Sequence, residues 1–203
     1  MKSLSEIDTV SKRASRAIGF SWGIAEEVGK NIRLLELFGF KGVKNLNDFY
    51  REKKIKKFEK LKIIKKKNKP IKSYFCPIIS GTSFLDQAKN FENSKEIKIE
   101  KIAYPILFIP FVSRASAIIG KRILLKFGKN NFLFNLNQNI FSNFKDKEII
   151  KLTNSITLKF IQNTDNFLDK EWKELYNLSE NTFVEENENL KNKSAGAGLT
   201  DND

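Results

Sequence analysis

Two arginines, a tryptophan and a pair of glutamates lie close together in RASRAIGFSWGIAEEVG, residues 13–29. A guanidinium can hold a carboxylate or phosphate through two parallel hydrogen bonds, and a helix that begins here would offer free amides to the same anion. We therefore expect Arg16 to bind an anionic ligand, Trp22 to form a wall of the site and Glu27 to be its polar counterpart. The alternative is a plain turn between two helices, with acids that complement the dipole of the second one.

The two glutamates differ in their place on the predicted helix. Spacing at about 100° per residue puts Glu26 on the polar side, four residues before Lys30, which favours an ordinary ion pair within the helix. Glu27 falls at the edge of the apolar stripe, where it can point into a cleft. Glu27 is therefore the candidate for a catalytic or ligand-binding carboxylate, and a structural role is the alternative.

Two more positions could supply chemistry. The stretch ISGTSFLDQ, residues 79–87, has small polar residues before a predicted helix, and its Asp86 is a second candidate carboxylate, although Ser83 and Asp86 also have the spacing of a helix cap. Arg114 follows a long apolar run in a chain where 31 of the 37 basic residues are lysine. An arginine at this position indicates that its planar guanidinium is needed to make two parallel hydrogen bonds to one partner. Its partner is a ligand carboxylate, an internal glutamate or the acidic end of the chain.

The residues that are missing restrict the chemistry further. The chain has no histidine, which excludes Ser-His-Asp and Cys-His nucleophiles as well as imidazole-bound metals. Cys76 is the only cysteine and stands in an apolar stretch, so we expect an inert buried thiol in a reducing cytoplasm. No phosphate-binding loop or dinucleotide fingerprint occurs, and we expect neither a cofactor nor a metal. An enzyme built on this chain would use Glu27 or Asp86 as its general base.

The chain is strongly basic, with a net charge of +13, yet the basic residues do not have the pattern of a nucleic-acid site. The lysine run at 53–69 contains no arginine and only Phe58 as an aromatic residue, whereas base-reading and base-stacking surfaces combine basic residues with arginine or aromatic rings. Abundant lysine and asparagine are typical of an AT-rich genome. A solvated basic face is the favoured interpretation, and nucleic-acid binding is the least favoured function.

Capping and periodicity predict a helical hairpin over residues 1–40. Ser3 and Glu6 form a capping-box pattern that begins the first helix, and Gly19 ends it. Ser21 begins a second helix that Gly39 ends. The apolar residues that share one face of the first helix are Leu4, Ile7, Val10, Ala14 and Ala17. The residues expected on the buried stripe of the second helix are Ile24, Ala25, Val28, Ile32 and Leu35.

The remainder of the chain reads as strands mixed with short helices. Strands are predicted at 72–80 and 155–163, a strand with buried extended chain at 96–110, a hairpin around Gly128, and short helices within 80–91, 110–120 and 166–178. The fold class is α+β, with the N-terminal hairpin packed on a mainly antiparallel or mixed sheet at 72–178. We expect one domain over 1–185 and a flexible tail at 186–203. No leader or membrane span is expected, since the most apolar run, 104–112, is short and contains two prolines.

The chain ends in SAGAGLTDND, residues 194–203. Glycine gives the backbone freedom, so Gly196 and Gly198 form a predicted hinge. Asp201 and Asp203 give the tip a negative charge on an otherwise basic chain. We expect the tip to dock on arginines, such as Arg13, Arg16 or Arg114, of its own chain, another subunit or a partner.

Several of these stretches together resemble an uncharacterised bacterial protein family, domain of unknown function 3726. The landmarks are SLSEIDTVSKRASRAIGFSWGIAEEVGKNIRLLE, FCPIISGTSFLDQA, YPILFIPFVSRASAIIGKRILLKF and the terminal SAGAGLTDND. The resemblance covers nearly the whole chain. It implies no reaction, ligand or catalytic residue, and it implies that the Ala-Gly segment with its acidic tip is a family trait.

The sequence thus favours a cytoplasmic accessory protein of metabolism that binds a small anionic metabolite or a partner protein. The alternative is a histidine-free hydrolase, lyase or isomerase acting on a carboxylate-bearing metabolite. A homo-oligomer is left open, and no membrane partner is expected.

Deleting residues 194–203 tests the role of the tail. Because we expect the tip to dock without forming part of the core, the deletion should abolish binding of the ligand or partner and leave the melting temperature nearly unchanged. Calorimetry and thermal unfolding of the two forms measure both quantities. Unchanged binding by the shortened chain would show that residues 194–203 take no part in binding.

Overall fold

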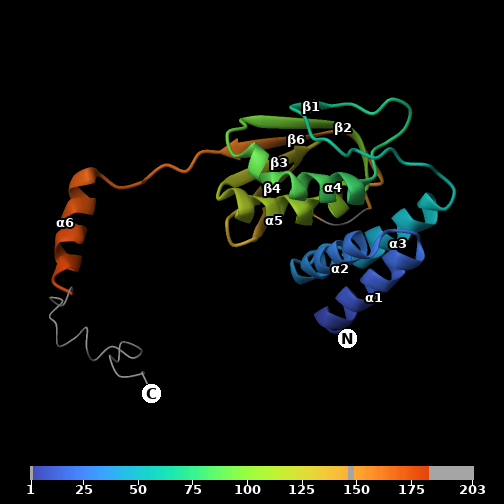
Figure 1. Cartoon of the computed structure of the whole chain (residues 1–203), viewed down its shortest axis with the longest axis horizontal. Helices are drawn as coiled ribbons and strands as arrows, with labels where there is room; N and C mark the ends of the chain where they lie inside the picture. The colour runs from blue at the N-terminus through green and yellow to red at the C-terminus, as the bar shows by residue number, and fades with distance from the viewer. Residues whose placement is uncertain (1, 146–148, 183–203) are drawn as a thin grey trace, which may run out of the picture. The chain divides into compact units, whose positions relative to one another are not determined.

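The computed structural model describes residues 2–145 and 149–182. The chain divides at Asn163 into two compact units, Met1–Asn163 and Thr164–Asp203. The first unit contains a group of helices and a sheet with its covering helices, and it carries the cavities described below (Figure 1). The predicted α+β class is confirmed.

Three helices form the N-terminal part of the first unit: α1 (Leu4–Ala17), α2 (Trp22–Leu37) and α3 (Gly42–Lys53). The Ser3 hydroxyl accepts a hydrogen bond from the amide of Glu6 at 3.1 Å, as the capping pattern predicts. Gly19 and Gly39 follow α1 and α2 with φ of +98° and +75°, backbone angles that favour glycine. The predicted hairpin is therefore present, and α3 adds a third helix to it.

The buried side of α1 differs from its apolar face. Ser11 and Ser15 are the buried residues of this helix, while Val10 of the apolar face is 59% exposed. The reason is the close approach of α1 to α2. A Cβ atom added at Gly29 of α2 would lie 2.8 Å from the carbonyl oxygen of Asp8 and 3.2 Å from the Cβ of Lys12. The small side chains of Ser11 and Ser15 fit this contact, whereas Val10 lies on the exposed side of the helix.

The sheet has six strands in the order β1-β2-β6-β3-β4-β5. Only β1 and β2 run parallel, and the other neighbouring pairs are antiparallel. The strands are β1 (Lys67–Asn68), β2 (Glu96–Ala103), β3 (Arg122–Phe127), β4 (Asn130–Phe134), β5 (Ile140–Ser142) and β6 (Leu152–Ile161). The hairpin predicted around Gly128 is formed by β3 and β4.

The segment predicted as a strand at 72–80 forms no regular strand, and its last four residues belong to a helix. Only Phe75 takes part in strand pairing, through isolated bridges to Glu59 and Ile102, and α4 (Pro77–Asp86) begins two residues later. Proline lacks an amide hydrogen and has its φ fixed near the helical value, so Pro77 fits the first turn of a helix better than a strand interior.

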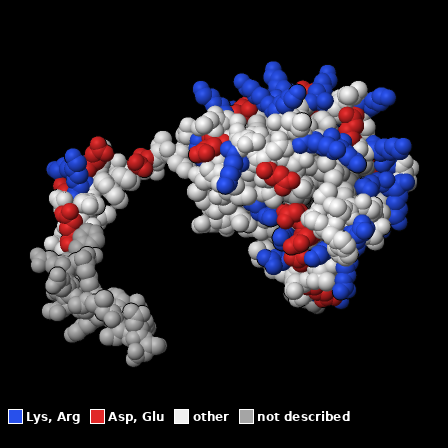
Figure 2. Space-filling model, in the orientation of Figure 1, with Lys and Arg blue, Asp and Glu red and all other residues white. Residues whose placement is uncertain are grey.

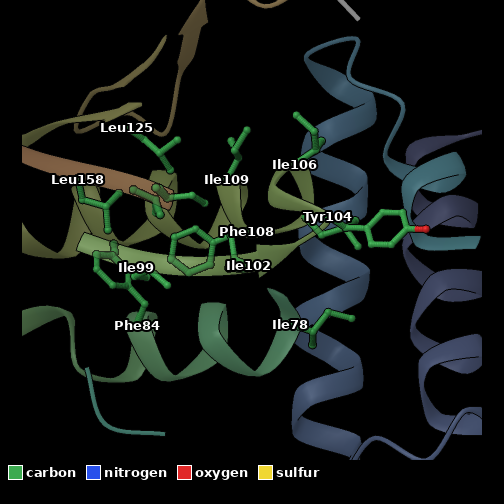
Figure 3. Packing of buried hydrophobic residues seen from close by; sticks show 14 of the residues in the cluster. Ile78, Phe84, Ile99, Ile102, Tyr104, Ile106, Phe108, Ile109, Leu125 and Leu158 are labelled. Carbon is green, nitrogen blue, oxygen red and sulfur yellow. The ribbon is translucent and has the colours of Figure 1, made fainter. Parts of the chain in front are cut away.

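Helices cover one face of the sheet. α4 and α5 (Ile109–Ile119) lie beneath it in Figure 1, and the short helices η1 (Ala88–Phe91) and η2 (Pro105–Phe108) connect them to the strands. Alternate residues of β3, Ile123, Leu125 and Phe127, are buried against these helices, whereas Arg122 and Lys126 are exposed. Leu125 and Leu158 of the sheet belong to the same buried cluster as Phe84 and Phe108 of the helical layer (Figure 3).

The second unit contains α6 (Asp169–Glu180). Its start is capped by Glu171, which accepts a hydrogen bond from the amide of Leu168 at 2.7 Å. Trp172 stacks on Phe167 with ring centroids 5.5 Å apart, and Leu175 and Tyr176 are exposed. The predicted tail hinge and tip, Gly196, Gly198, Asp201 and Asp203, lie outside the described residues. In the ranges 2–145 and 149–182, no helix is long and apolar enough to cross a membrane.

Replacing Gly29 with alanine tests the contact between α1 and α2. The added methyl group would be forced against the backbone of Asp8, so Gly29→Ala should lower the free energy of unfolding by about 1–3 kcal/mol. Gly23 of the same helix is the matched control, since nothing lies within 4 Å of a Cβ added there. Gly23→Ala should leave stability unchanged or raise it by roughly 0.5 kcal/mol. Urea unfolding measures both, and equal effects would refute the close contact.

Candidate functional site

A cavity of about 470 Å³ opens at the start of α2. Four lysines from the end of α3 and the segment that follows it, Lys53, Lys56, Lys57 and Lys60, line one side. The remaining lining residues are Gly19, Phe20, Ser21, Ile24, Phe58, Cys76 and Ile79. We call this space the lysine cavity.

The four lysines differ in how they are engaged. The Lys53 ammonium donates to the carbonyl oxygen of Ile18 at 3.2 Å and lies 4.8 Å from the ring centre of Phe20. Lys56 pairs with Glu52 at 3.3 Å. In the part of the chain that the structure describes, the ammonium groups of Lys57 and Lys60 have no ion-pair partner. These two charges are therefore the ones available to a ligand.

The start of α2 contributes polar groups to the same cavity. Ser21 is the N-cap residue, but its side chain makes no capping hydrogen bond. The first intrahelical bond at this end comes from the amide of Ala25 to the carbonyl of Ser21, at 2.9 Å. The amides of Trp22, Gly23 and Ile24 therefore have no intrahelical acceptor. Free amides and the positive end of a helix dipole both favour a bound anion.

The floor of the lysine cavity is apolar and chemically inert. Phe20 and Cys76 are buried, and Ile24 and Ile79 are partly buried. Burial raises the pKa of Cys76 to about 11, so the thiol stays protonated near neutral pH. Cys76 therefore supplies packing surface to the cavity and no thiolate nucleophile.

A carboxylate holds the segment that carries Lys57 and Lys60. Glu59 accepts hydrogen bonds from the amides of Ile71, Lys72 and Ser73 at 2.9, 2.5 and 2.6 Å. These backbone hydrogen bonds lower the pKa of Glu59. The amide of Glu59 also donates to the carbonyl of Tyr74 at 2.9 Å, and this hydrogen bond is part of the isolated β-bridge between Glu59 and Phe75. Glu59 is thus a positioning residue for one side of the cavity.

A second carboxylate, Glu52, joins α3 to the sheet. It accepts a hydrogen bond from the buried Tyr104 hydroxyl at 3.0 Å and pairs with Lys151 at 3.2 Å. Figure 3 shows the Tyr104 ring directed from the sheet towards the N-terminal helices. Burial opposes ionisation of Glu52, yet the hydrogen bonds from Tyr104, Lys151 and Lys56 outweigh it and lower the pKa of this carboxyl group. The Lys56 side of the cavity is therefore connected to the sheet.

A cleft with carboxylates lies on the other side of the start of α2. Its volume is about 470 Å³, and it shares Ser21 and Ile24 with the lysine cavity. The other lining residues are Gly23, Glu26, Glu27, Lys30, Thr82, Leu85 and Asp86. We call it the carboxylate cleft. It contains both residues that the sequence singled out as candidate bases, Glu27 and Asp86.

Glu27 is committed to ion pairs inside the protein. Its carboxylate pairs closely with Arg114 of α5, and Lys30 lies 3.4 Å away. The Arg114 guanidinium also donates to the side-chain oxygen of the buried Asn31 at 3.2 Å. Of the partners considered for Arg114, the internal glutamate is the one found. Glu26 pairs with Lys30 at 3.1 Å, as its position on the helix predicts.

Arg16 and Trp22 do not face either cavity. The Arg16 guanidinium donates to the carbonyl of Phe20 at 3.1 Å and lies 5.5 Å from the ring centre of Trp22. Trp22 is 58% exposed, so it walls neither the lysine cavity nor the carboxylate cleft. The two residues contact each other and brace the turn between α1 and α2. Whether any of the predicted residues bind a ligand stays a prediction.

The lysines at the cavity were missed as site residues, although the sequence contained a signal. They belong to the lysine run that was interpreted as a solvated basic face. Figure 2 shows basic side chains gathered over this unit, most densely along its upper edge near β1 and β2. Lysine density alone therefore does not distinguish the residues of the cavity, because only the tertiary structure places some of these lysines around one space with the start of α2. No group of acidic residues and cysteine within 2–145 and 149–182 is arranged to hold a metal ion.

Taken together, the geometry is that of an α+β protein with a basic cavity of ligand size at a helix start. Residues 2–74 match a family described as protein of unknown function (DUF3726). The match confirms the predicted resemblance over the N-terminal helices and the lysine segment. No curated protein and no solved structure matches the chain.

Glu59→Gln tests how the lysine segment is held. Because the folded-state pKa of Glu59 is lowered, its carboxylate stabilises the fold above the unfolded value of 4.5, and this contribution is lost as the pH falls through the folded-state value. The variant should therefore be less stable than the parent at pH 7, with a difference that narrows below about pH 4.5. Urea unfolding between pH 7 and pH 3.5 measures it. Glu92→Gln, at an exposed carboxylate, is the control, and a pH-independent difference for Glu59→Gln would contradict the assignment.

Proposed function

We propose that this protein binds a small anionic metabolite in the lysine cavity and acts as a cytoplasmic accessory component of metabolism. One observation carries the proposal: four lysines and the open first turn of the 16-residue helix α2 converge on one cavity. Both features favour a negatively charged ligand. Among the described residues, no carboxylate forms an ion pair with Lys57 or Lys60.

The size and walls of the cavity favour a small molecule. A volume of about 470 Å³ lies within the usual range for ligand sites, and such sites combine apolar walls with a few polar groups. Phe20, Phe58 and Ile79 supply the apolar surface here. A ligand with one carboxylate or phosphate and a modest carbon skeleton fits this combination better than the extended backbone of a nucleic acid.

An enzyme is the second candidate, and one observation supports it. Glu27 and Asp86 line the same cleft, as a two-carboxylate mechanism requires. Since Glu27 is already paired with Arg114 and Lys30, Asp86 is the carboxylate left to act as a general base. In this version, Asp86→Asn abolishes turnover of a carboxylate-bearing metabolite while the metabolite still binds.

Binding of a partner protein is the third candidate function, and the observation that supports it comes from α6 instead of the two cavities. Trp172, Leu175 and Tyr176 of α6 are exposed together, and aromatic residues are enriched at protein interfaces. Loss of a co-purifying protein after a Trp172→Ala change would support this version.

The double variant Lys57→Ala/Lys60→Ala tests the main proposal. Pools of carboxylated and phosphorylated metabolites are added to the purified protein, and a ligand at about 100 times its Kd should stabilise the fold by about 2.7 kcal/mol. The double variant should lower affinity at least about tenfold, because two charged hydrogen-bond donors are lost.

Lys126→Ala/Lys129→Ala is the matched control, since it removes the same charge from the β3–β4 hairpin and should keep affinity within about twofold at 0.15 M salt. The absence of any thermal shift with every pool, together with nothing retained in mass spectra of the natively purified protein, would refute the proposal.

A further inference from the structure

The lysine cavity and the carboxylate cleft meet at the start of α2. Ser21 and Ile24 line both of them, so the two spaces lie on either side of the same helical turn. One space presents four lysines, and the other presents Glu26, Glu27 and Asp86. A ligand that occupies both would meet opposite charges at its two ends.

Most of these charges are already satisfied by the protein. Lys56 pairs with Glu52, and Lys30 is shared by Glu26 and Glu27. Among the described residues, Lys57 and Lys60 have no ion-pair partner in the lysine cavity, and Asp86 has none in the carboxylate cleft. The unpaired charges therefore have opposite signs on the two sides of α2.

The boundary between the two spaces is able to contact a ligand as well. The exposed Ser21 hydroxyl makes no capping bond, and the amides of the first turn of α2 have no acceptor within the helix. Ile24 adds partly buried apolar surface beside them. A short carbon chain crossing this turn would find both hydrogen-bonding groups and apolar contact.

We propose that the ligand is a zwitterion, of the amino acid or amino-phosphate class, whose anionic group binds at Lys57 and Lys60 and whose ammonium group binds at Asp86. This inference rests on the proposed function and specifies its ligand. A ligand with anionic groups at both ends is disfavoured, because its second anion would face Glu26, Glu27 and Asp86. A ligand with an amine alone would leave the lysines unpaired.

A series of ω-amino acids tests the proposal, with the matched unbranched monocarboxylates as probes that lack only the amine. NMR titration or calorimetry measures the affinity of each pair for the full-length protein at 0.05 M salt. We expect at least one chain length at which the amino acid binds roughly 3- to 5-fold more tightly than its monocarboxylate, the effect of one exposed ion pair. The chain length with the largest ratio reports the distance between the two binding groups.

Asp86→Asn should remove this preference while leaving the affinity for the monocarboxylate unchanged. Asp86 is exposed and makes no described ion pair, so the variant is expected to fold normally. Asp165→Asn, which changes an exposed aspartate of the second unit, is the control and should keep the preference.

The outcomes separate the two proposals. Equal affinity for amino acid and monocarboxylate at every chain length, or a preference that persists in Asp86→Asn, would overturn the zwitterion assignment and leave the lysine cavity as an anion site. If neither series binds, and Lys57→Ala/Lys60→Ala behaves like the parent protein with every metabolite pool, the anion site itself is refuted.

Discussion

The ion pair between Glu27 and Arg114 fixes the helix on which both cavities depend. Glu27 lies in the second turn of α2 and Arg114 in α5, so the pair ties the N-terminal helices to the helical layer of the sheet. Both side chains are largely withdrawn from water, and such a pair is costly to break because either charge left alone would be poorly solvated. With α2 held in this way, its first turn separates the lysine cavity from the carboxylate cleft.

The lysine cavity brings like charges together, and that arrangement has a cost. Lys53, Lys56, Lys57 and Lys60 would repel one another less on an extended segment than around one concave space. The ion pair with Glu52 offsets the charge of Lys56. Glu59 accepts hydrogen bonds from backbone amides and so holds the segment that carries Lys57 and Lys60 in place despite the repulsion. Two unpaired ammonium groups are left, and a bound anion would relieve their repulsion. This is the physical reason to associate the cavity with a ligand.

Local signals predicted the elements well and their contacts less well. The first turn after Ser3, the ends at Gly19 and Gly39, and the β3–β4 hairpin depend on residues a few positions apart, and each is confirmed. The strand predicted at 72–80 was wrong because Pro77 serves the start of α4. The buried face of α1 could not be predicted from its apolar residues, because apolar spacing shows which residues share a side and the neighbouring element decides which side is buried.

The sequence by itself determined the fold class, the boundaries of α1 and α2, the lack of imidazole chemistry and the ion-pair geometry of Glu26 with Lys30. All of these follow from composition or from residues within about four positions of each other. Only the tertiary structure decided that Glu27 would meet Arg114, 87 positions away, and that Arg16 and Trp22 would lie outside both cavities. It also decided which lysines of a long run surround a cavity, since concavity arises from the packing of segments that no local pattern brings together.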